Sequence, residues 1–486
     1  MKTTVLFPIA ALALLVAAAT ALPLRAAETP AYQTDFAPDE FRARWAKVFE
    51  AIGEQSVALI AGAPLANGFL FPRQTNDFYY LCGVETPGSY LLLDGRGRRV
   101  TLFLPPRNAR LEASEGRVLS AADADLARKL TGADAVESTE AMGGDWLARP
   151  EGRLPEAIYT PFAPAEGAGQ SRWELQASNA AVAADPWDGR IPREARLVEL
   201  LRARYPRAAV RDLTPAIDGL RSVKSPREVA LVRQASRLAG FALLEAMRST
   251  RPGVFEYQLD AVARYVFLAG GARLEAYRSI VASGTENIWN PHYYRNTSEL
   301  KAGDLVLLDY APDFRYYVSD ITRMWPVSGR YSPVQRELLG FVLAYRNAVL
   351  ERIRPGVTAK QVLEEVRKAM EPVLRATKFS KPAYEQGARK LVETGGGVFS
   401  HPVGMAVHDD GAYQDQPLRP GHVFSIDPQL RVPEENLYIR YEDVVGVTES
   451  GVENFTAFLP SALDDIEKAM RGEGLLVKFP PPPVSK

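Results

Sequence analysis

The stretch 305–324 constrains the fold more than any other part of this sequence. Leu305–Leu308 is a continuous apolar run, which is typical of a strand buried on both faces. A Pro-Asp turn signal follows at residues 312–313, and the chain then returns as a second strand. Asp309 ends the first strand and Asp320 lies on the returning one, eleven positions later. The sequence therefore predicts a hairpin that brings two carboxylates together.

Two facing carboxylates in an apolar setting require compensation. Burying an ionised carboxylate without a partner is costly, and a second anion beside it raises that cost. Either one carboxyl group keeps its proton or a cation lies between the two. The alternative is that Asp309 and Asp320 are solvated turn residues, because aspartate is common in loops. We favour cations, most simply two, because further ligand candidates follow downstream.

Composition excludes several functional classes. The 486 residues include 47% hydrophobic and 24% charged residues, as expected for a globular protein of two or three domains. Lys plus Arg is 58 and Asp plus Glu is 59, so charge gives no case for binding nucleic acid or an anionic membrane. Cys82 is the only cysteine, which excludes an internal disulfide and a cysteine-rich zinc site.

The N-terminus has the pattern of an export signal. Lys2 precedes the apolar stretch Val5–Ala19, and small residues at Ala19 and Ala21 fit a cleavage site. We therefore expect residues 1–27 to be a signal peptide, with no stable membrane span after processing and a periplasmic or secreted mature protein. A retained N-terminal anchor is the alternative.

The remaining chain divides into two domains and a tail. We expect an α/β domain over 36–215, a catalytic α+β domain over 220–465 and a proline-rich tail over 475–486. Apolar residues at helical spacing predict a helix over 39–53. Short apolar runs between turn residues predict four strands. These are Val57–Ile60, Phe78–Leu81, Tyr90–Leu93 and Val100–Leu104.

Helices with strong start signals alternate with strand hairpins in the second half. Ser225, Ser332 and Thr358 each have Glu or Gln three residues later, the pattern of a capping box at a helix start. The predicted helices reach Met247, Ile353 and Leu374. This alternation favours helices that cover a strongly curved antiparallel sheet.

Three segments downstream of the hairpin supply further ligand chemistry. His401 follows the glycine run 395–397, where glycine lets the backbone approach closely, and His408 comes seven positions later. Asp427 follows the apolar run Val423–Ile426, so it repeats the form of the first hairpin aspartate. Each has an ordinary alternative, since a lone histidine is commonly structural and a strand-terminal carboxylate commonly faces water.

Strand periodicity over 437–444 puts Arg440 and Glu442 on one face. Arg440 has an ordinary reading as the partner of a carboxylate. The candidate metal ligands are Asp309, Asp320, His401, Asp427 and Glu442. Hard oxygen donors with one nitrogen suit Mn²⁺, or Zn²⁺ and Co²⁺ in a two-metal cluster.

Four motifs in this order resemble the catalytic domain of the aminopeptidase P and prolidase family of metallopeptidases, family M24. They are LLDYAPDFRYYVSDITR, FSHPVGMAVHD, VFSIDP and YIRYEDVV. The segment DLTPAIDGLRSVKSPREVALVRQA is similar to the family's interdomain linker, and RQTNDFYYLCGV is similar to part of its N-terminal domain. The resemblance covers most of residues 36–460 and implies a "pita-bread" catalytic domain.

The resemblance also implies roles for individual residues. Asp309 and Asp320 would be metal ligands with His401, Asp427 and Glu442, and Asp320 and Glu442 would each bridge two ions. Asp427 would also take the proton from the attacking water. His292 and His408 would shape the site around the scissile bond and stabilise the tetrahedral intermediate, and Arg440 would lie beside the last glutamate in the substrate region.

Two departures from the family pattern are present. The family usually has glutamate where this chain has Asp427, whose side chain is one methylene shorter. Gly397 stands where many aminopeptidases P carry another histidine. A misplacement of about 1 Å can cost on the order of a hundredfold in rate.

The predicted function is that of an exported metallo-aminopeptidase with two divalent ions, manganese being favoured. It would hydrolyse the bond before proline in peptides with a free N-terminus, through a metal-bound hydroxide. Three alternatives stay open: an Xaa-Pro dipeptidase, a metal-free relative of the creatinase type, and a catalytically weak or inactive peptide-binding relative. The sequence is compatible with a homo-oligomer.

Overall fold

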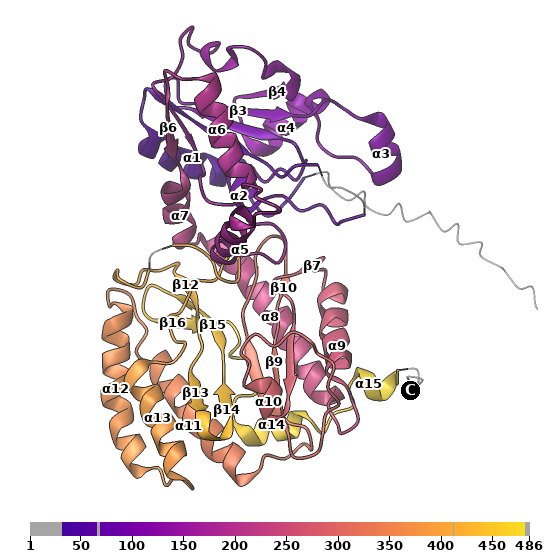
Figure 1. Cartoon of the computed structure of the whole chain (residues 1–486), viewed down its shortest axis with the longest axis vertical. Coiled ribbons are helices and arrows are strands. Elements are labelled where there is room, and N and C mark those ends of the chain that lie inside the picture. The colour runs from indigo at the N-terminus through magenta and orange to yellow at the C-terminus, as the bar shows by residue number, and fades with distance from the viewer. Residues whose placement is uncertain (1–31, 66–68, 412, 482–486) are drawn as a thin grey trace, which may run out of the picture.

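Figure 1 shows the computed structural model of the chain, which describes residues 32–65, 69–411 and 413–481. The N-terminal half, coloured indigo to purple, lies above the C-terminal half, whose colour runs from pink to yellow. Helix α7 (Thr214–Ser222) lies at their junction. The predicted signal peptide, residues 1–27, lies outside the described residues.

The N-terminal half contains a six-stranded mixed sheet in the order β4-β3-β2-β1-β5-β6. Strands β1, β2 and β3 pair antiparallel, whereas β4, β5 and β6 join the sheet in parallel. The strands are β1 (Ser56–Ala61), β2 (Tyr90–Asp94), β3 (Arg99–Leu104), β4 (Ala135–Ser138), β5 (Ala157–Thr160) and β6 (Ala209–Asp212). The α-helices are α1 (Pro38–Ile52), α2 (Asn76–Cys82), α3 (Ala109–Glu115), α4 (Ala124–Thr131), α5 (Arg172–Ala184) and α6 (Arg193–Arg204). Short 3-10 helices are η1 (Ala121–Asp123), η2 (Thr139–Ala141) and η3 (Trp146–Ala148).

Helix α1 confirms the helix predicted over 39–53. Its apolar stripe is buried, and fully burying one large apolar side chain contributes about 1.5–3 kcal/mol. The indole N–H of Trp45 also donates to the Leu81 carbonyl oxygen at 2.7 Å, so the helix is fixed against α2. The predicted strands near β1, β2 and β3 are confirmed as well.

The strand predicted at Phe78–Leu81 is wrong, because this segment lies in helix α2. All seven residues of α2 are buried, so no polar face interrupts the apolar run. A fully buried helix and a fully buried strand cannot be told apart by periodicity alone. Gly83 ends the helix in the left-handed conformation, with φ +67°.

Every strand pair described in the C-terminal half is antiparallel. The strands form ladders β8-β9-β11, β12-β15-β16, β13-β14 and β7-β10. Their bounds are β7 (Leu274–Glu275), β8 (Ile280–Ser283), β9 (Leu305–Asp309), β10 (Pro312–Asp313), β11 (Thr322–Pro326), β12 (Val423–Ile426), β13 (Gln429–Val432), β14 (Leu437–Arg440), β15 (Asp443–Val447) and β16 (Val452–Asn454). Helices flank these ladders on both sides in Figure 1, so the predicted fold class, antiparallel strands covered by helices beside an α/β domain, is confirmed.

The returning strand of the acidic hairpin starts later than predicted. β11 begins at Thr322, so Asp320 precedes this strand instead of lying on it. Arg315 and Tyr316 both adopt positive φ values, +53° and +73°, which interrupt an extended chain. The residues predicted as a turn, 312–313, pair as β10 with β7.

Three helices of the C-terminal half begin where the sequence predicts. The Ser225, Ser332 and Thr358 side chains each accept from a backbone N–H three residues on, which completes three capping boxes. The helices are α8 (Pro226–Ser249), α9 (Glu256–Ala269), α10 (Gly284–Ile288), α11 (Pro333–Leu350), α12 (Ala359–Ala376), α13 (Pro382–Thr394), α14 (Leu463–Ala469) and α15 (Leu475–Lys478), with the 3-10 helix η4 (Pro433–Glu435). The predicted tail, 475–486, thus starts as a short helix, and residues 482–486 lie outside the described part. Among the described helices, none has the length and apolar character that crossing a membrane requires.

Candidate active site

Asp309 and Asp320 lie side by side and buried, as the hairpin predicts. Asp309 is the last residue of β9 and is paired with Thr322 of β11, which places Asp320 near it. The Tyr277 hydroxyl lies 2.7 Å from Asp309 Oδ1 and 2.9 Å from Asp320 Oδ1. Burial raises the pKa of Asp320 well above its usual value, and the neighbouring Asp309 raises it further. The two carboxylates therefore repel each other in a setting that favours a cation or a shared proton.

The guanidinium of Arg440 lies among three of the predicted ligands. Its Nη1 donates to Asp309 Oδ2 at 2.5 Å, its Nε to Asp427 Oδ1 at 2.8 Å, and its Nη2 to Glu442 Oε2 at 2.7 Å. The structure confirms that Arg440 and Glu442 share a face, and Arg440 is the partner of several carboxylates at once. Burial raises the pKa of Asp427 and of Glu442, against the lowering effect of Arg440.

His401 completes the cluster. Its Nε2 lies 3.5 Å from Asp320 Oδ2 and 3.3 Å from the Ser425 hydroxyl oxygen. Burial, with a smaller effect of His408, lowers the pKa of His401 to about 3, so the imidazole is neutral at pH 7. A neutral imidazole has a free lone pair and can bind a metal ion.

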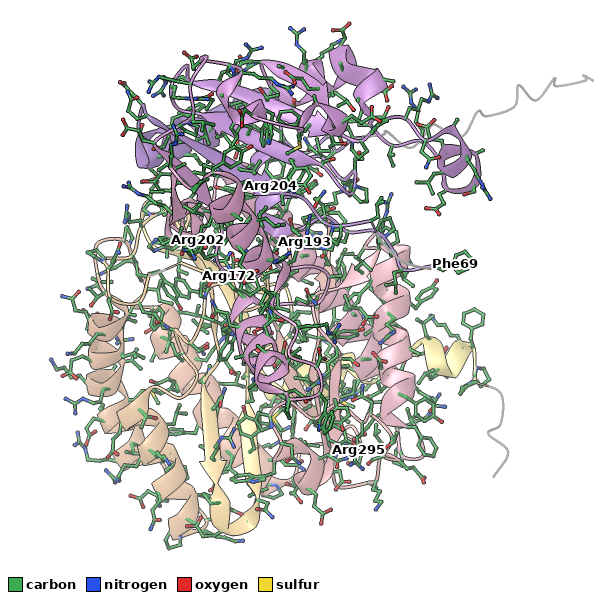
Figure 2. The ribbon with its side chains drawn as sticks, turned by 45° about the horizontal axis from the view of Figure 1, so that its top comes forward. Phe69, Arg172, Arg193, Arg202, Arg204 and Arg295 are labelled. Carbon is green, nitrogen blue, oxygen red and sulfur yellow. The ribbon has the colours of Figure 1, made fainter. Side chains whose placement is uncertain are left out.

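His408 is contacted by two side chains of α5 that the sequence did not single out. The Trp173 indole nitrogen lies 2.9 Å from His408 Nδ1, and a Glu174 carboxylate oxygen lies 2.6 Å from the same atom. Nδ1 accepts from Trp173 when it is unprotonated and donates to Glu174 when it carries a proton. The backbone N–H of His408 also donates to the Ser171 hydroxyl at 3.2 Å. In Figure 2, α5 lies in front of the C-terminal half, with Arg172 at its first turn.

Part of this cluster lines a cavity of about 420 Å³, whereas His401, Asp427 and Glu442 are not among the residues that line it. The residues of the C-terminal half that line the cavity are Tyr277, Arg278, Ile280, His292, Asp309, Asp320, Val407, His408 and Arg440. The opposite wall is formed by residues 169–178, which include the start of α5. Burial and the nearby cation of Arg440 lower the pKa of His292. His422 does not line this cavity; it is buried and its Nδ1 accepts from the Arg419 backbone N–H at 3.3 Å.

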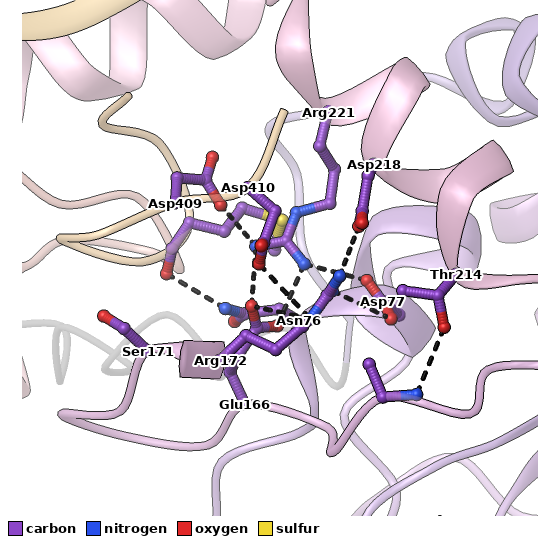
Figure 3. A network of polar contacts seen from close by, with 12 residues as sticks. Asn76, Asp77, Glu166, Ser171, Arg172, Thr214, Asp218, Arg221, Asp409 and Asp410 are labelled. Atoms are coloured by element: carbon purple, nitrogen blue, oxygen red, sulfur yellow. Dashed lines mark hydrogen bonds and ion pairs between the residues drawn. The ribbon is translucent and has the colours of Figure 1, made fainter. Parts of the chain in front are cut away.

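A polar network between the two halves holds α5 in place (Figure 3). Arg221 of α7 donates to Asp77 at 2.8 Å and to Glu166 at 2.9 Å, both from the N-terminal half. Arg221 also donates to Asp409, the residue after His408. Arg172, the first residue of α5, pairs with Asp77 at 3.5 Å and with Asp410 at 3.2 Å, so the same network joins α5 to the His408 loop.

The donor set fits a pair of divalent cations. Asp309, Asp320 and Glu442 each contribute one carboxylate oxygen, and these three atoms lie within 4.8 Å of one another. Potential ligand atoms of Asp320, His401 and His408 form a second group within the same distance. Glu442 Oε1 is buried and has no hydrogen-bond partner within the described part of the chain. Carboxylates with an imidazole are the ligands that Mn²⁺, Zn²⁺ and Co²⁺ accept. These residues can therefore hold metal ions, and the assignment of each ligand stays a prediction.

Comparison with known proteins gives matches along both halves. The metallopeptidase family M24 matches residues 230–449, and the aminopeptidase P N-terminal domain matches residues 41–147. An Xaa-Pro aminopeptidase of Escherichia coli strain K12 is 31% identical over 459 residues, which cover 90% of this chain and 98% of that protein. The structure of Escherichia coli aminopeptidase P with the inhibitor Pro-Leu matches with a TM-score of 0.71 and 28% identity, over 90% of this chain and 99% of that one. Proline aminopeptidase P II of Yersinia pestis matches with a TM-score of 0.70 and 30% identity, over the same shares.

The fold and the acidic cavity define a metallopeptidase of the pita-bread class. With 31% identity over 90% of its length to a curated relative, the chain belongs to the aminopeptidase P family. This confirms the family and the enzyme class predicted from the sequence, a metallo-aminopeptidase.

Sequence reasoning missed the residues that support the ligands. Tyr277, Trp173 and Glu174 reach the cluster from elements that no local pattern connects to it, and Ser425 reaches His401 from the run that ends at Asp427. Their roles depend on which elements pack together, and a single sequence carries no such signal. Gln429 was also missed, although it lies only two residues after Asp427.

Proposed function

We propose that this protein hydrolyses the N-terminal Xaa-Pro bond of peptides and uses two divalent cations, Mn²⁺ being favoured. One observation carries the proposal: four carboxylates and one imidazole, far apart in sequence, converge on one cluster, and two of these carboxylates line a cavity together with two further histidines. The activity of the Escherichia coli relative, as its name gives it, supports the Xaa-Pro substrate.

In this proposal Asp309, Asp320, His401, Asp427 and Glu442 hold the cations. When bound, the ions would lower the pKa of a water molecule and polarise the carbonyl of the scissile bond. Asp427 would accept a proton from the attacking water and pass it to the leaving proline nitrogen.

His408 and His292 act on the substrate side of the cavity. When His408 Nδ1 accepts from the Trp173 N–H, the imidazole carries its proton on Nε2, where it can donate to the oxyanion that develops on the carbonyl oxygen. His292, whose pKa is lowered by burial, is neutral at pH 7 and can donate or accept beside the bond. Residues of helix α5, among them Glu174 and Leu175, line the same cavity.

A peptidase assay with matched variants tests the proposal. Purified protein with Mn²⁺ should release the first amino acid from an Xaa-Pro-Yaa tripeptide, and chelator should abolish the release. Asp309→Asn should lower the activity by at least about a thousandfold, because the substitution removes a carboxylate ligand from the proposed metal site. Asp304→Asn, in a loop outside the cavity, should retain it. Wild-type activity equal to that of Asp309→Asn would refute the proposal, and peptide binding without turnover would favour the inactive relative.

Arg278 favours the Xaa-Pro dipeptidase as the second candidate. Its exposed guanidinium lines the cavity, stacks 4.9 Å from the Tyr294 ring and lies 3.5 Å from the His292 carbonyl oxygen. Within the described part of the chain its partners are this carbonyl oxygen and this ring and no carboxylate, so it can take the free carboxylate of a short substrate. A dipeptide turned over faster than its tripeptide, with this preference lost in Arg278→Met, would decide for the dipeptidase.

We also propose that the protein is exported, and the composition of residues 1–27 supports this proposal. Lys2 followed by the apolar stretch Val5–Ala19 and small residues fits a cleaved signal. N-terminal sequencing of the protein recovered from the periplasm or medium should give a start between Leu22 and Glu28. A start at Met1 on a membrane-bound protein would show a retained anchor instead.

A further inference from the structure

The two departures from the family pattern, Gly397 and Asp427, are in direct contact. The backbone N–H of Gly397 donates to the Asp427 carbonyl oxygen at 3.0 Å. A Cβ atom at position 397 would lie 2.6 Å from that carbonyl oxygen and 2.9 Å from the Asp427 carboxylate oxygen Oδ2. The chain at 397 therefore approaches Asp427 so closely that only glycine fits.

The side chain of Gln429 fills the space that a residue at 397 would occupy. Its Nε2 lies 2.6 Å from the position of the missing Gly397 Cβ. The same Nε2 donates a hydrogen bond to Asp427 Oδ2. One amide thus takes the place of a side chain at 397 and also contacts the shortened acid.

The register of β13 and β14 places a second donor on the same carboxylate. Gln429 and Arg440 are directly opposite in this antiparallel pair, so their side chains lie on one face. Arg440 Nε donates to Asp427 Oδ1 at 2.8 Å, while Gln429 Nε2 donates to Oδ2. Each oxygen of Asp427 is therefore held by one member of a cross-strand pair.

The glycine run brings this arrangement about. Gly396 has φ +57°, and a Cβ there would lie 2.8 Å from the Gln429 backbone nitrogen. The backbone at 396–397 consequently packs against the backbone at 427–429 without side chains between them. This close approach is what the sequence predicted for the run 395–397.

We propose that Gln429 is a positioning residue that sets the orientation of the Asp427 carboxylate and offsets its missing methylene. This inference deepens the proposed function, since it takes Asp427 to be a metal ligand and the acceptor of the water proton. It follows that aspartate is the better residue at 427 in this chain. A glutamate would drive its longer side chain into the Gln429 amide and the backbone at Gly397.

Manganese titration calorimetry of the whole metal-free protein tests the inference independently of catalysis. Gln429→Met keeps the length of the side chain but removes the donor, and Gln429→Ala is a second variant in case the first does not fold. Either change should weaken the binding of one of the two ions on the order of tenfold, and should lower kcat more than it raises KM. Gln176→Met, on the exposed face of α5, is the matched control.

A double variant tests whether removal of the Gln429 side chain restores manganese binding to a protein with glutamate at position 427. Asp427→Glu alone should weaken manganese binding, and Asp427→Glu combined with Gln429→Ala should bind more tightly than Asp427→Glu. A merely structural role of Gln429 would make the double variant worse than either single one. Manganese binding by Gln429→Met and Gln429→Ala within twofold of the wild type, or a double variant no tighter than Asp427→Glu, would overturn the inference. Absence of any divalent-cation binding by the wild-type protein would instead overturn the proposed function.

Discussion

Replacement of Arg440 by methionine tests the electrostatic account of the site. The guanidinium contacts Asp309, Asp427 and Glu442 at 2.5, 2.8 and 2.7 Å, and the four groups are almost fully buried. Methionine keeps much of the buried volume and removes the charge. In the metal-free protein the three carboxylates then lose the cation that they share, and the neighbouring anion Asp320 adds to their repulsion.

The expected destabilisation follows from the burial of these charges. Removing one partner of a buried ion pair costs about 3–5 kcal/mol, because the remaining charge is left uncompensated. For a unit of about 250 residues, 1 kcal/mol lowers the melting temperature by roughly 2–4 °C. We therefore expect Arg440→Met to unfold on the order of 10 °C below the wild-type protein in chelator. Protonation of one carboxylate at low pH should reduce this difference.

Saturating Mn²⁺ should remove most of the difference, because bound cations replace the missing positive charge. Thermal unfolding followed by circular dichroism, with and without Mn²⁺, measures both effects. The control is Arg233→Met, since the Arg233–Glu453 pair is 38% and 41% exposed and surface pairs contribute about 0–1 kcal/mol. An Arg440→Met protein that melts with the wild type in chelator, or whose deficit is the same with Mn²⁺, would refute the reasoning.

Two further variants test the contacts around His408. Burial alone would raise the pKa of Asp409, but Arg221 and Lys224 hold it below its usual 3.8, so its stabilisation is present above pH 4 and is lost as the pH falls below that value. Asp409→Asn should therefore lower the free energy of unfolding, measured in urea at pH 7, by about 3 kcal/mol. Below pH 4 the stability of the variant should decrease less with falling pH than that of the wild type; the same decrease in both proteins would contradict this. Trp173→Phe keeps the ring against His408 but removes the N–H, a hydrogen bond of about 1 kcal/mol, so kcat should fall roughly five- to tenfold at unchanged manganese content. A normal kcat would show that Trp173 does not set the His408 proton.

The sequence predicted those features that depend on local pattern. Capping boxes at Ser225, Ser332 and Thr358 identify helix starts because the residues that make each hydrogen bond lie three positions apart. The convergence of Asp309 and Asp320 was accessible for a related reason, since a hairpin returns the chain to its own start.

Features that depend on packing between distant segments were not accessible. The sequence of α2 predicts a strand because contacts with both halves of the molecule bury the whole helix and remove the helical period. A sequence motif identifies Asp427 as a candidate ligand. The contact of the Gln429 amide with Asp427 depends on the register of β13 with β14 and on the close approach of Gly397, which the sequence does not show.

The N-terminal half forms part of the active site through the network in Figure 3. Arg221 joins Asp409, which follows His408, to Asp77 and Glu166 of that half, and all of these side chains are buried. Arg172, at the first turn of α5, pairs with Asp410 at 3.2 Å and extends the network to the helix that contacts His408. Both walls of the cavity are thus fixed by one set of buried charges. A change in that set far from the cation ligands should therefore alter substrate binding and the orientation of His408 before it alters the affinity for metal.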